Sequence, residues 1–203
     1  MNVAILLDGD FSRRLVFKKL GHWPSPEEIE AFCRSIITQE EVLSATYYYD
    51  CPPFSKTKPL PVTKASFDFS HSRVHRRAEE FQKAMQTNHF FVYRRGHLSF
   101  DGWTLKEDVI QNLIRSPRAL TDQDFEPVLS QKQVDMKIGF DVAKLCIKGL
   151  VERIILATSD ADFIPAIDFA RAYGVEVVLL SDIDFVKRTK GRLLKAFTSH
   201  RLV

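Results

Sequence analysis

The sequence predicts a single α/β domain over residues 1–203, built on a central, mainly parallel sheet flanked by helices. Residues 3–7 (VAILL) and 153–158 (RIILAT) are continuous apolar runs, which are typical of strands covered on both faces. Strand-like and helix-like segments alternate along the chain, as they do in βαβ proteins. The chain has 203 residues, 45% of them hydrophobic and 27% charged, which is enough for one core without disulfides.

Helix starts and strand composition define the remaining elements. Ser25 can cap a helix, Pro26 fits its first turn and Glu28 completes a capping box, so we expect a helix from there to about Thr38. Gly96 is expected to turn the strand at 89–95 into a hairpin with 97–100. The same signals predict helices at 71–87, 134–148, 161–173 and 188–197, and strands at 42–49, 89–95 and 175–180.

Two segments do not fit this alternation. Residues from about 50 to 70 contain four prolines and are expected to form a long loop without regular elements (Pro52, Pro53, Pro59, Pro61). Residues from about 109 to 132 show no clear period, and we expect an irregular segment there.

Composition excludes several classes of protein. The three cysteines (Cys33, Cys51, Cys146) are widely spaced without a CxxC pair, which indicates reduced thiols in the cytoplasm and neither a disulfide framework nor a zinc site. No stretch approaches the roughly 20 apolar residues of a membrane span, so we expect no membrane partner. The carboxylates at Asp8 and Asp10 also argue against a signal peptide. The sequence leaves open whether the chain forms a homo-oligomer.

Positive charge is concentrated in two stretches, although the net charge is only +3. Residues 71–97 carry arginines with interleaved aromatic residues, and a second basic cluster lies near the C-terminus (Lys187, Arg188, Lys190, Arg192, Lys195). Such patches suit a polyanionic partner, because contact with phosphates releases counterions. A solvated helix face beside ordinary core aromatics is the alternative.

Aspartates follow the two apolar strands where each strand ends. Asp8 and Asp10 come after the first, and Asp160 and Asp162 come after the second. Because ligands of open parallel sheets bind beyond the carboxyl ends of the strands, these acids are expected to share one crevice. Asp135 starts the helix before the second strand. We do not expect such a helix to begin at that edge, so its place in the crevice depends on residues 109–132 bringing it across.

A cluster of ionised carboxylates has a defined chemistry. Two carboxylates 4 Å apart repel by about 4 kcal/mol at an effective dielectric of 20, so the cluster must bind protons or a cation. Oxygen ligands select Mg²⁺ or Mn²⁺ over zinc, and such an ion can assist an in-line phosphoryl transfer.

Each of these acids also has an ordinary structural explanation. Asp160 or Ser159 can cap the following helix, Asp135 can be a favourable first-turn charge, and Asp8 and Asp10 can be turn residues. Asp141 shares a helical stripe with three lysines and is expected to be their surface partner (Lys137, Lys144, Lys148).

Several of these stretches together resemble the NYN domain, a branch of the PIN-like nuclease superfamily, in its bacterial LabA-like form. They are VAILLDGD, QKQVDMKIGFDVAKLC and IILATSDADFIPAIDFARAYGVEVVLL, with further similarity in YYYDCPPF and FVYRRGHL. The resemblance implies a parallel sheet flanked by helices and metal-dependent hydrolysis of RNA, with an acidic centre (Asp8, Asp135, Asp160, Asp162). Many members have Asn where this chain has Phe11, which implies either weakened activity or a substitute role for Asp10 or Ser12.

The leading hypothesis is therefore a ribonuclease that depends on Mg²⁺ or Mn²⁺ and acts on single-stranded RNA. Asp8, Asp135 and Asp160 are expected to hold the metal, and Asp162 to complete the site or orient water. The expected phosphate contacts come from three basic residues (Lys137, Arg94, Arg95).

Two alternatives remain open. A non-catalytic RNA-binding or scaffold module is favoured by the basic and aromatic stretch and allowed by Phe11. A haloacid-dehalogenase-type phosphatase is suggested by Asp8-Gly9-Asp10, in which Asp8 would attack phosphorus and Asp10 would act as acid and base.

Overall fold

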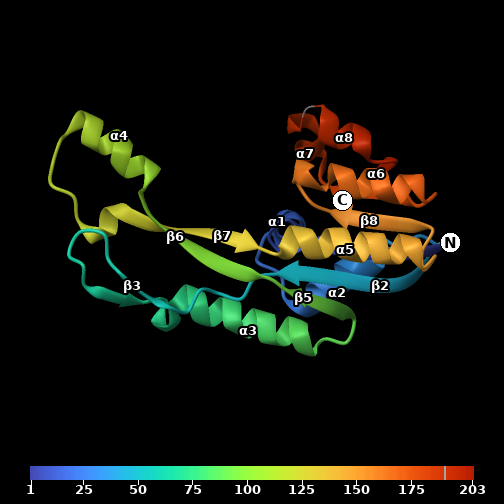
Figure 1. Cartoon of the computed structure of the whole chain (residues 1–203), viewed down its shortest axis with the longest axis horizontal. Coiled ribbons are helices and arrows are strands. Elements are labelled where there is room, and N and C mark those ends of the chain that lie inside the picture. The colour runs from blue at the N-terminus through green and yellow to red at the C-terminus, as the bar shows by residue number, and fades with distance from the viewer. Residues whose placement is uncertain (190) are drawn as a thin grey trace. The chain divides into compact units, whose positions relative to one another are not determined.

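In a computed structural model that describes residues 1–189 and 191–203, six parallel strands form one sheet in the order β10-β9-β8-β1-β2-β5 (Figure 1). Strand β1 lies inside this sheet, paired with β2 and β8, and its residues Val3–Leu7 are fully buried. The predicted parallel sheet is confirmed. Its strands are β1 (Asn2–Asp8), β2 (Val42–Asp50), β5 (Phe91–Arg95), β8 (Arg153–Ala157), β9 (Glu176–Ser181) and β10 (Ser199–Leu202).

The described residues form two units. We call the first the sheet unit (Met1–Asp50, Lys83–Gly96, Gln133–Val203) and the second the inserted unit (Cys51–Gln82, His97–Lys132). How the chain divides into domains stays a prediction. Lys190, one of the basic residues near the C-terminus, lies outside the described residues.

Helices cover both faces of the sheet, with α5 and α6 on the near face in Figure 1 and α1 and α2 behind it. Helix α2 has the predicted capping box, because Ser25 Oγ accepts the N–H of Glu28 and the Glu28 carboxylate accepts the N–H of Ser25. No helix in the described part of the chain is long and apolar enough to cross a membrane. The helices are α1 (Gly9–Leu20), α2 (Pro26–Ser35), α5 (Val134–Ile147), α6 (Ile164–Ala172), α7 (Ile183–Arg188) and α8 (Arg192–Ala196), and α3 (Arg73–Thr87) has residues in both units.

The C-terminal helix predicted at 188–197 is wrong. Two short helices occupy this region, α7 ending at Arg188 and α8 beginning at Arg192, with Gly191 at a positive φ of 85° before α8. A left-handed glycine interrupts helical geometry, which explains the break. Helix α1 and strand β10 were not predicted.

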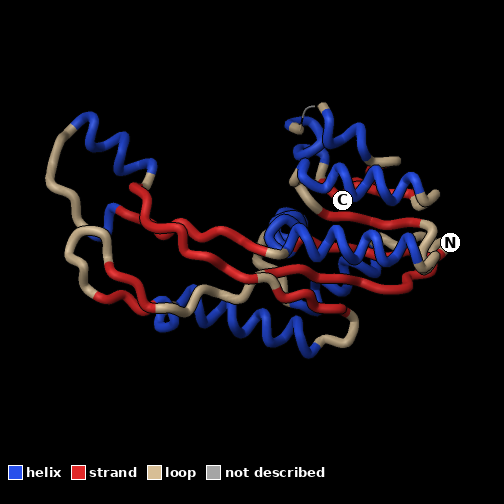
Figure 2. Tube along the Cα trace, viewed as in Figure 1, coloured by secondary structure: helices blue, strands red, loops and turns tan. Residues whose placement is uncertain are grey.

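The inserted unit corrects three expectations (Figure 2). The Pro-rich segment contains a short antiparallel pair, β3 (Thr57–Pro59) and β4 (Ser66–Asp68); Pro59 ends its strand, where a missing N–H is tolerated. The segment at 109–132 is not irregular, because it contains most of α4 (Glu107–Arg115) and β7 (Phe125–Lys132). The hairpin with 97–100 is wrong, since β5 pairs with β2 whereas β6 (His97–Leu105) pairs with β7.

An aromatic cluster holds the inserted unit together. Phe69 is buried, and its ring centroid lies 4.9–6.1 Å from four other rings (Phe54, Phe67, Phe100, Trp103). The indole N–H of Trp103 donates to the carbonyl of Pro59 at 2.9 Å. These contacts join β3, β4 and β6 and supply a small core of their own.

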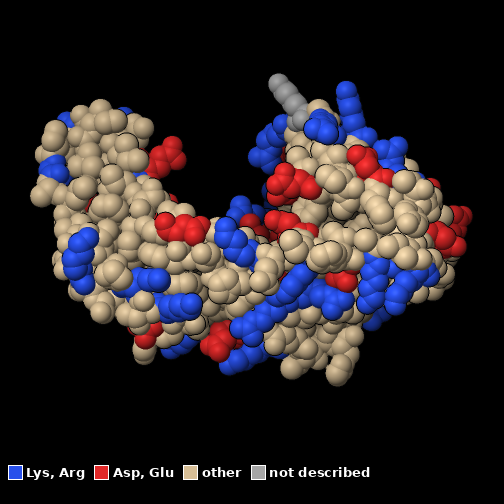
Figure 3. Space-filling view, in the orientation of Figure 1, with Lys and Arg blue, Asp and Glu red and all other residues tan. Residues whose placement is uncertain are grey.

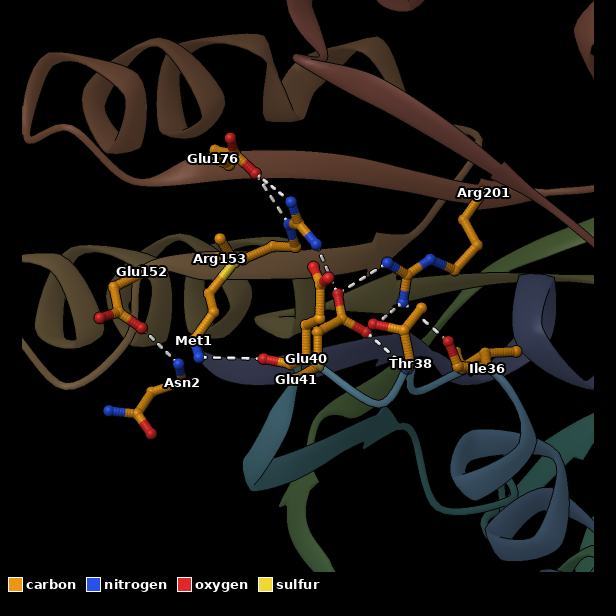
Figure 4. A network of polar contacts seen from close by, with 10 residues as sticks. All are labelled: Met1, Asn2, Ile36, Thr38, Glu40, Glu41, Glu152, Arg153, Glu176 and Arg201. Atoms are coloured by element: carbon orange, nitrogen blue, oxygen red, sulfur yellow. Dashed lines mark hydrogen bonds and ion pairs between the residues drawn. The ribbon is translucent and has the colours of Figure 1, made fainter.

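Glu41 is a buried carboxylate that joins separate parts of the sheet unit (Figure 4). Its Oε1 accepts hydrogen bonds from Arg153 at 2.6 Å and Arg201 at 2.7 Å, and its Oε2 accepts the N–H of Thr38 at 2.9 Å. Arg153 also pairs with Glu176. Burial opposes the charge of Glu41, but the bonds from Arg201, Thr38 and Arg153 outweigh it and hold the pKa near 2.

Replacing Glu41 by Gln should lower the free energy of unfolding at pH 7 by about 2 to 4 kcal/mol, because two arginines lose a buried partner. The pKa of Glu41 lies below the ordinary glutamate value of 4.5, so its stabilising effect is complete above pH 4.5 and is lost toward pH 2. The stability difference between wild type and E41Q should therefore shrink over this window in denaturant titrations.

Glu176→Gln is the matched control, since Glu176 pairs with the same Arg153 but its side chain is 42% exposed. It should cost less than about 1 kcal/mol. Equal effects of the two substitutions would show that burial of Glu41 is not what gives the network its strength.

Candidate active site at the strand ends

Asp8 is the last residue of β1 and occupies the N-cap position of α1. Its pKa is raised to about 6, chiefly by burial and further by the neighbouring carboxylates of Asp10 and Asp135, whereas the backbone N–H groups of Phe11 and Asp10 partly oppose the rise. Asp8 is therefore a carboxyl group whose negative charge is poorly compensated within the protein.

The turn after Asp8 requires glycine. A Cβ on Gly9 would lie 2.7 Å from the carbonyl oxygen of Tyr49 and 3.1 Å from Cβ of Asp50. Only a residue without a side chain lets α1 begin this close to the end of β2. The close approach brings Asp50 to the same edge as Asp8. The sequence interpretation missed Asp50, although it follows the same rule of an acid at the end of a parallel strand.

Asp135 lies in the first turn of α5. Partial burial raises its pKa, and so do the carboxylates of Asp160 and Asp162. Asp8 in turn is affected by Asp135, so these acids share one edge of the sheet. The expectation that α5 would begin at the opposite edge was wrong, because a helix that leads into a parallel strand runs antiparallel to it and begins at the carboxyl edge.

Asp160 and Asp162 lie in the turn after β8. The hydroxyl of Thr158, which is fully buried, accepts the N–H of Asp160 at 3.1 Å, and Asp160 Oδ1 accepts the N–H of Asp162 at 2.8 Å. The structural interpretation of Asp160 as a cap is therefore correct, yet its carboxylate also acts on Asp135. Ser159 is exposed. Thr158, which shapes the turn, was missed.

Phe11 stands where many NYN domains have Asn, and Asp10 and Ser12 were the residues expected to take over the role of that Asn. Phe11 packs edge-on against Phe185 of α7, with ring centroids 5.2 Å apart. Asp10 is exposed and forms an ion pair with Arg14 at 2.9 Å. Ser12 is 1% exposed, and within the described part of the chain its Oγ has no hydrogen-bond partner.

Asp141 is not the surface partner that we expected, because it is only 6% exposed. Arg94 donates to both of its oxygens, at 2.8 and 2.9 Å, and the hydroxyl of Tyr49 donates to Oδ2 at 3.0 Å. Helical spacing placed Asp141 beside lysines but did not reveal that β5 packs against this face of α5. Arg94 is thus tied to Asp141, whereas Arg95 is exposed and Lys137 Nζ donates to the carbonyl of Arg95.

The donor chemistry of this edge suits a hard divalent cation. The predicted acids offer only oxygen ligands, and their mutual repulsion favours a bound positive charge (Asp8, Asp135, Asp160, Asp162). As the side chains stand, no three His, Cys, Asp or Glu residues among those described are placed to hold one ion. The carboxylates are therefore electrostatic neighbours that must draw closer to share a metal.

Comparison with known proteins identifies the class. The NYN domain model matches residues 2–200, so the chain belongs to the NYN domain family, a branch of the PIN-like nuclease superfamily. Nucleases of this class act on RNA and generally use divalent metals.

Two individual proteins are similar to this chain. Uncharacterized protein MJ0482 of Methanocaldococcus jannaschii is 36% identical over 62 residues, which is 30% of this chain and 26% of that protein. The crystal structure of VPA0982, a protein of unknown function from Vibrio parahaemolyticus, matches with a TM-score of 0.50 and 13% identity, covering 100% of this chain and 92% of that one. The second likeness shows the fold alone.

Replacing Asp8 by Asn should stabilise the protein at neutral pH when metals are chelated. The pKa of Asp8 is raised from 3.8 to about 6, so the charged form destabilises the fold above pH 6 and has no effect below pH 3.8. We expect D8N to unfold with a free energy roughly 1 to 3 kcal/mol above wild type at pH 7 and to match it near pH 3.

Asp10→Asn is the control in the same denaturant titrations, because it breaks an exposed ion pair and should change stability by less than about 0.5 kcal/mol. A D8N variant that is less stable than wild type at pH 7 would contradict the raised pKa.

Proposed function

We propose that the chain is a ribonuclease that cleaves phosphodiester bonds of single-stranded RNA with Mg²⁺ or Mn²⁺. The observation that carries this proposal is the electrostatic coupling of acids from β1, α5 and the turn after β8. Membership in the NYN family supports a nuclease. The LabA-like motifs further support placing the chain in that branch, and its buried free cysteines support a cytoplasmic location.

In this mechanism Asp8, Asp135 and Asp160 would hold the ion, and Asp162 would complete the site or orient the attacking water. When bound, the ion supplies Lewis-acid polarisation and neutralises charge on the phosphate. Asp8 would serve as a ligand in its deprotonated form, which predominates above about pH 6. Asp160 Oδ1 accepts the N–H of Asp162, which holds the turn in place and would keep the Asp160 carboxylate positioned as a ligand.

Basic groups beside α5 orient the RNA. Arg95 is exposed at the end of β5, and Lys137 lies one half-turn beyond Asp135 on α5 with its ammonium at the Arg95 carbonyl. Both can therefore contact phosphates near the acids. Arg94 keeps Asp141 neutralised inside the structure and contributes to this surface by holding α5 against β5.

A non-catalytic RNA-binding module is the second candidate. The packing of Phe11 against Phe185, where many relatives have Asn, favours it, since it removes a polar side chain from the start of α1. The phosphatase alternative is disfavoured by Asp10, because its carboxylate is exposed and forms an ion pair with Arg14, which leaves it a poor acid and base for a phosphoryl group on Asp8.

Asp160→Asn should reduce cleavage of single-stranded RNA in Mn²⁺ by about 100-fold or more, because it removes one negative charge from the metal site. Asn keeps the oxygen that caps the turn, so the melting temperature should change little. The measurement is the cleavage rate of an end-labelled RNA with Mn²⁺ and with chelator.

Asp168→Asn, a substitution of the same kind at an exposed position of α6, should cleave like wild type. Cleavage of the RNA by D160N at the wild-type rate would contradict this mechanism. Wild-type protein that binds RNA equally with metal or chelator, yet cleaves none, would instead establish the non-catalytic module.

A further inference from the structure

A depression of about 390 Å³ lies between β5 and α5 of the sheet unit. Its volume falls within the range of small-ligand sites. All of its lining residues belong to these two elements (Tyr93, Arg94, Arg95, Lys137, Phe140, Asp141). It therefore combines aromatic, cationic and acidic groups on one surface.

The depression keeps a net positive charge after its internal pairs are accounted for. Asp141 is neutralised by two hydrogen bonds from Arg94 and is further engaged by the hydroxyl of Tyr49. Arg95 and Lys137 remain as cations, and Lys137 is fixed by its bond to the carbonyl of Arg95. Figure 3 shows Lys and Arg side chains gathered in a band beside α5 on the visible face. Two cations over a neutral floor suit a phosphate group.

Phe140 presents its ring to solvent at this position. It is 67% exposed on α5, more than the other exposed aromatic side chains of the described residues (Trp23, Tyr173, Phe67). An exposed aromatic ring beside cations is the combination that binds single-stranded nucleic acid, where bases stack on rings and the backbone follows positive charge.

The depression and Asp135 share helix α5 but not one face of it. Phe140 is five residues after Asp135, which corresponds to about 7 Å along the helix axis and about 140° around it. A strand that reaches both the acids and the depression therefore has to pass around α5, and the depression is a separate contact of that strand.

We propose that this depression binds one nucleotide of single-stranded RNA, with its base stacked on Phe140 and its phosphate held by Arg95 and Lys137. The proposal rests on the proposed function and states which part of the RNA substrate binds between β5 and α5. Stacking requires an unpaired base, so the subsite selects single strands over duplexes.

The test measures binding of a fluorescent single-stranded RNA to Asp160→Asn protein, which removes cleavage from the measurement. Adding Phe140→Ala should weaken binding about ten-fold or more, whereas Phe140→Trp should retain it. The same RNA with abasic positions should bind weakly and be insensitive to Phe140→Ala. Ile147→Ala is the matched control, because Ile147 is 63% exposed on the same helix and lies outside the depression.

Lys137→Gln separates the phosphate contact from stacking. It should lower the slope of log affinity against log salt by about one, whereas Phe140→Ala should leave the slope unchanged. Equal affinity of the F140A and I147A proteins for the single-stranded RNA would overturn the subsite. It would also be overturned if Phe140→Ala weakened the binding of duplex RNA or of an acidic peptide as much as it weakens the binding of single-stranded RNA.

These outcomes are distinct from failure of the proposed function. If wild type cleaves RNA but F140A binds like I147A, the subsite is wrong and the nuclease stands. If binding depends on Phe140 while no RNA is cleaved, the subsite stands and the nuclease mechanism is wrong.

Discussion

The fixed position of β1 is the constraint on which the candidate site depends. This strand is paired on both sides and buried on both faces, so Asp8 at its end cannot move away from its neighbours. Gly9 then lets α1 begin against the Tyr49 carbonyl, which brings the end of β2 to the same edge. Because α5 runs antiparallel to the strands, its first turn adds Asp135. The acids therefore lie close together because the strands are parallel, because α5 runs antiparallel to them, and because Gly9 permits the close approach of α1 to β2.

Two carboxylates of the sheet unit, Glu41 and Asp8, have pKa values shifted in opposite directions. Glu41, beside the starts of β2 and β8, has two arginines, and its pKa falls to about 2. Asp8, at a strand end, is partly buried beside other acids, and burial together with their charge raises its pKa to about 6. The first arrangement stabilises the fold, whereas the second stores electrostatic strain. Strain of this kind is common at functional sites, where a ligand can relieve it.

The sequence predicted most of the structural features that depend on residues close together in the chain. Continuous apolar runs located β1 and β8, and the Ser25–Glu28 box located α2. The rule that acids gather at strand ends pointed to Asp8 and Asp160 and, applied to β2, would also have found Asp50. Asp141 was misplaced because its partners, Arg94 and Tyr49, come from strands 47 and 92 residues away in the sequence. The aromatic core of the inserted unit was missed for the same reason, since Phe54 meets Phe100 only through folding.

The raised pKa of Asp8 connects stability to the proposed chemistry. A proton and a divalent ion would compete for the same carboxylate, so acidity below about pH 6 opposes the metal. A bound ion would also remove the repulsion that Asp135 receives from Asp160 and Asp162 and draw these side chains together. Any ligand that binds only the folded chain stabilises it. Carboxylates that crowd one edge of the sheet and repel one another are thus the arrangement expected of a site that a divalent cation would stabilise.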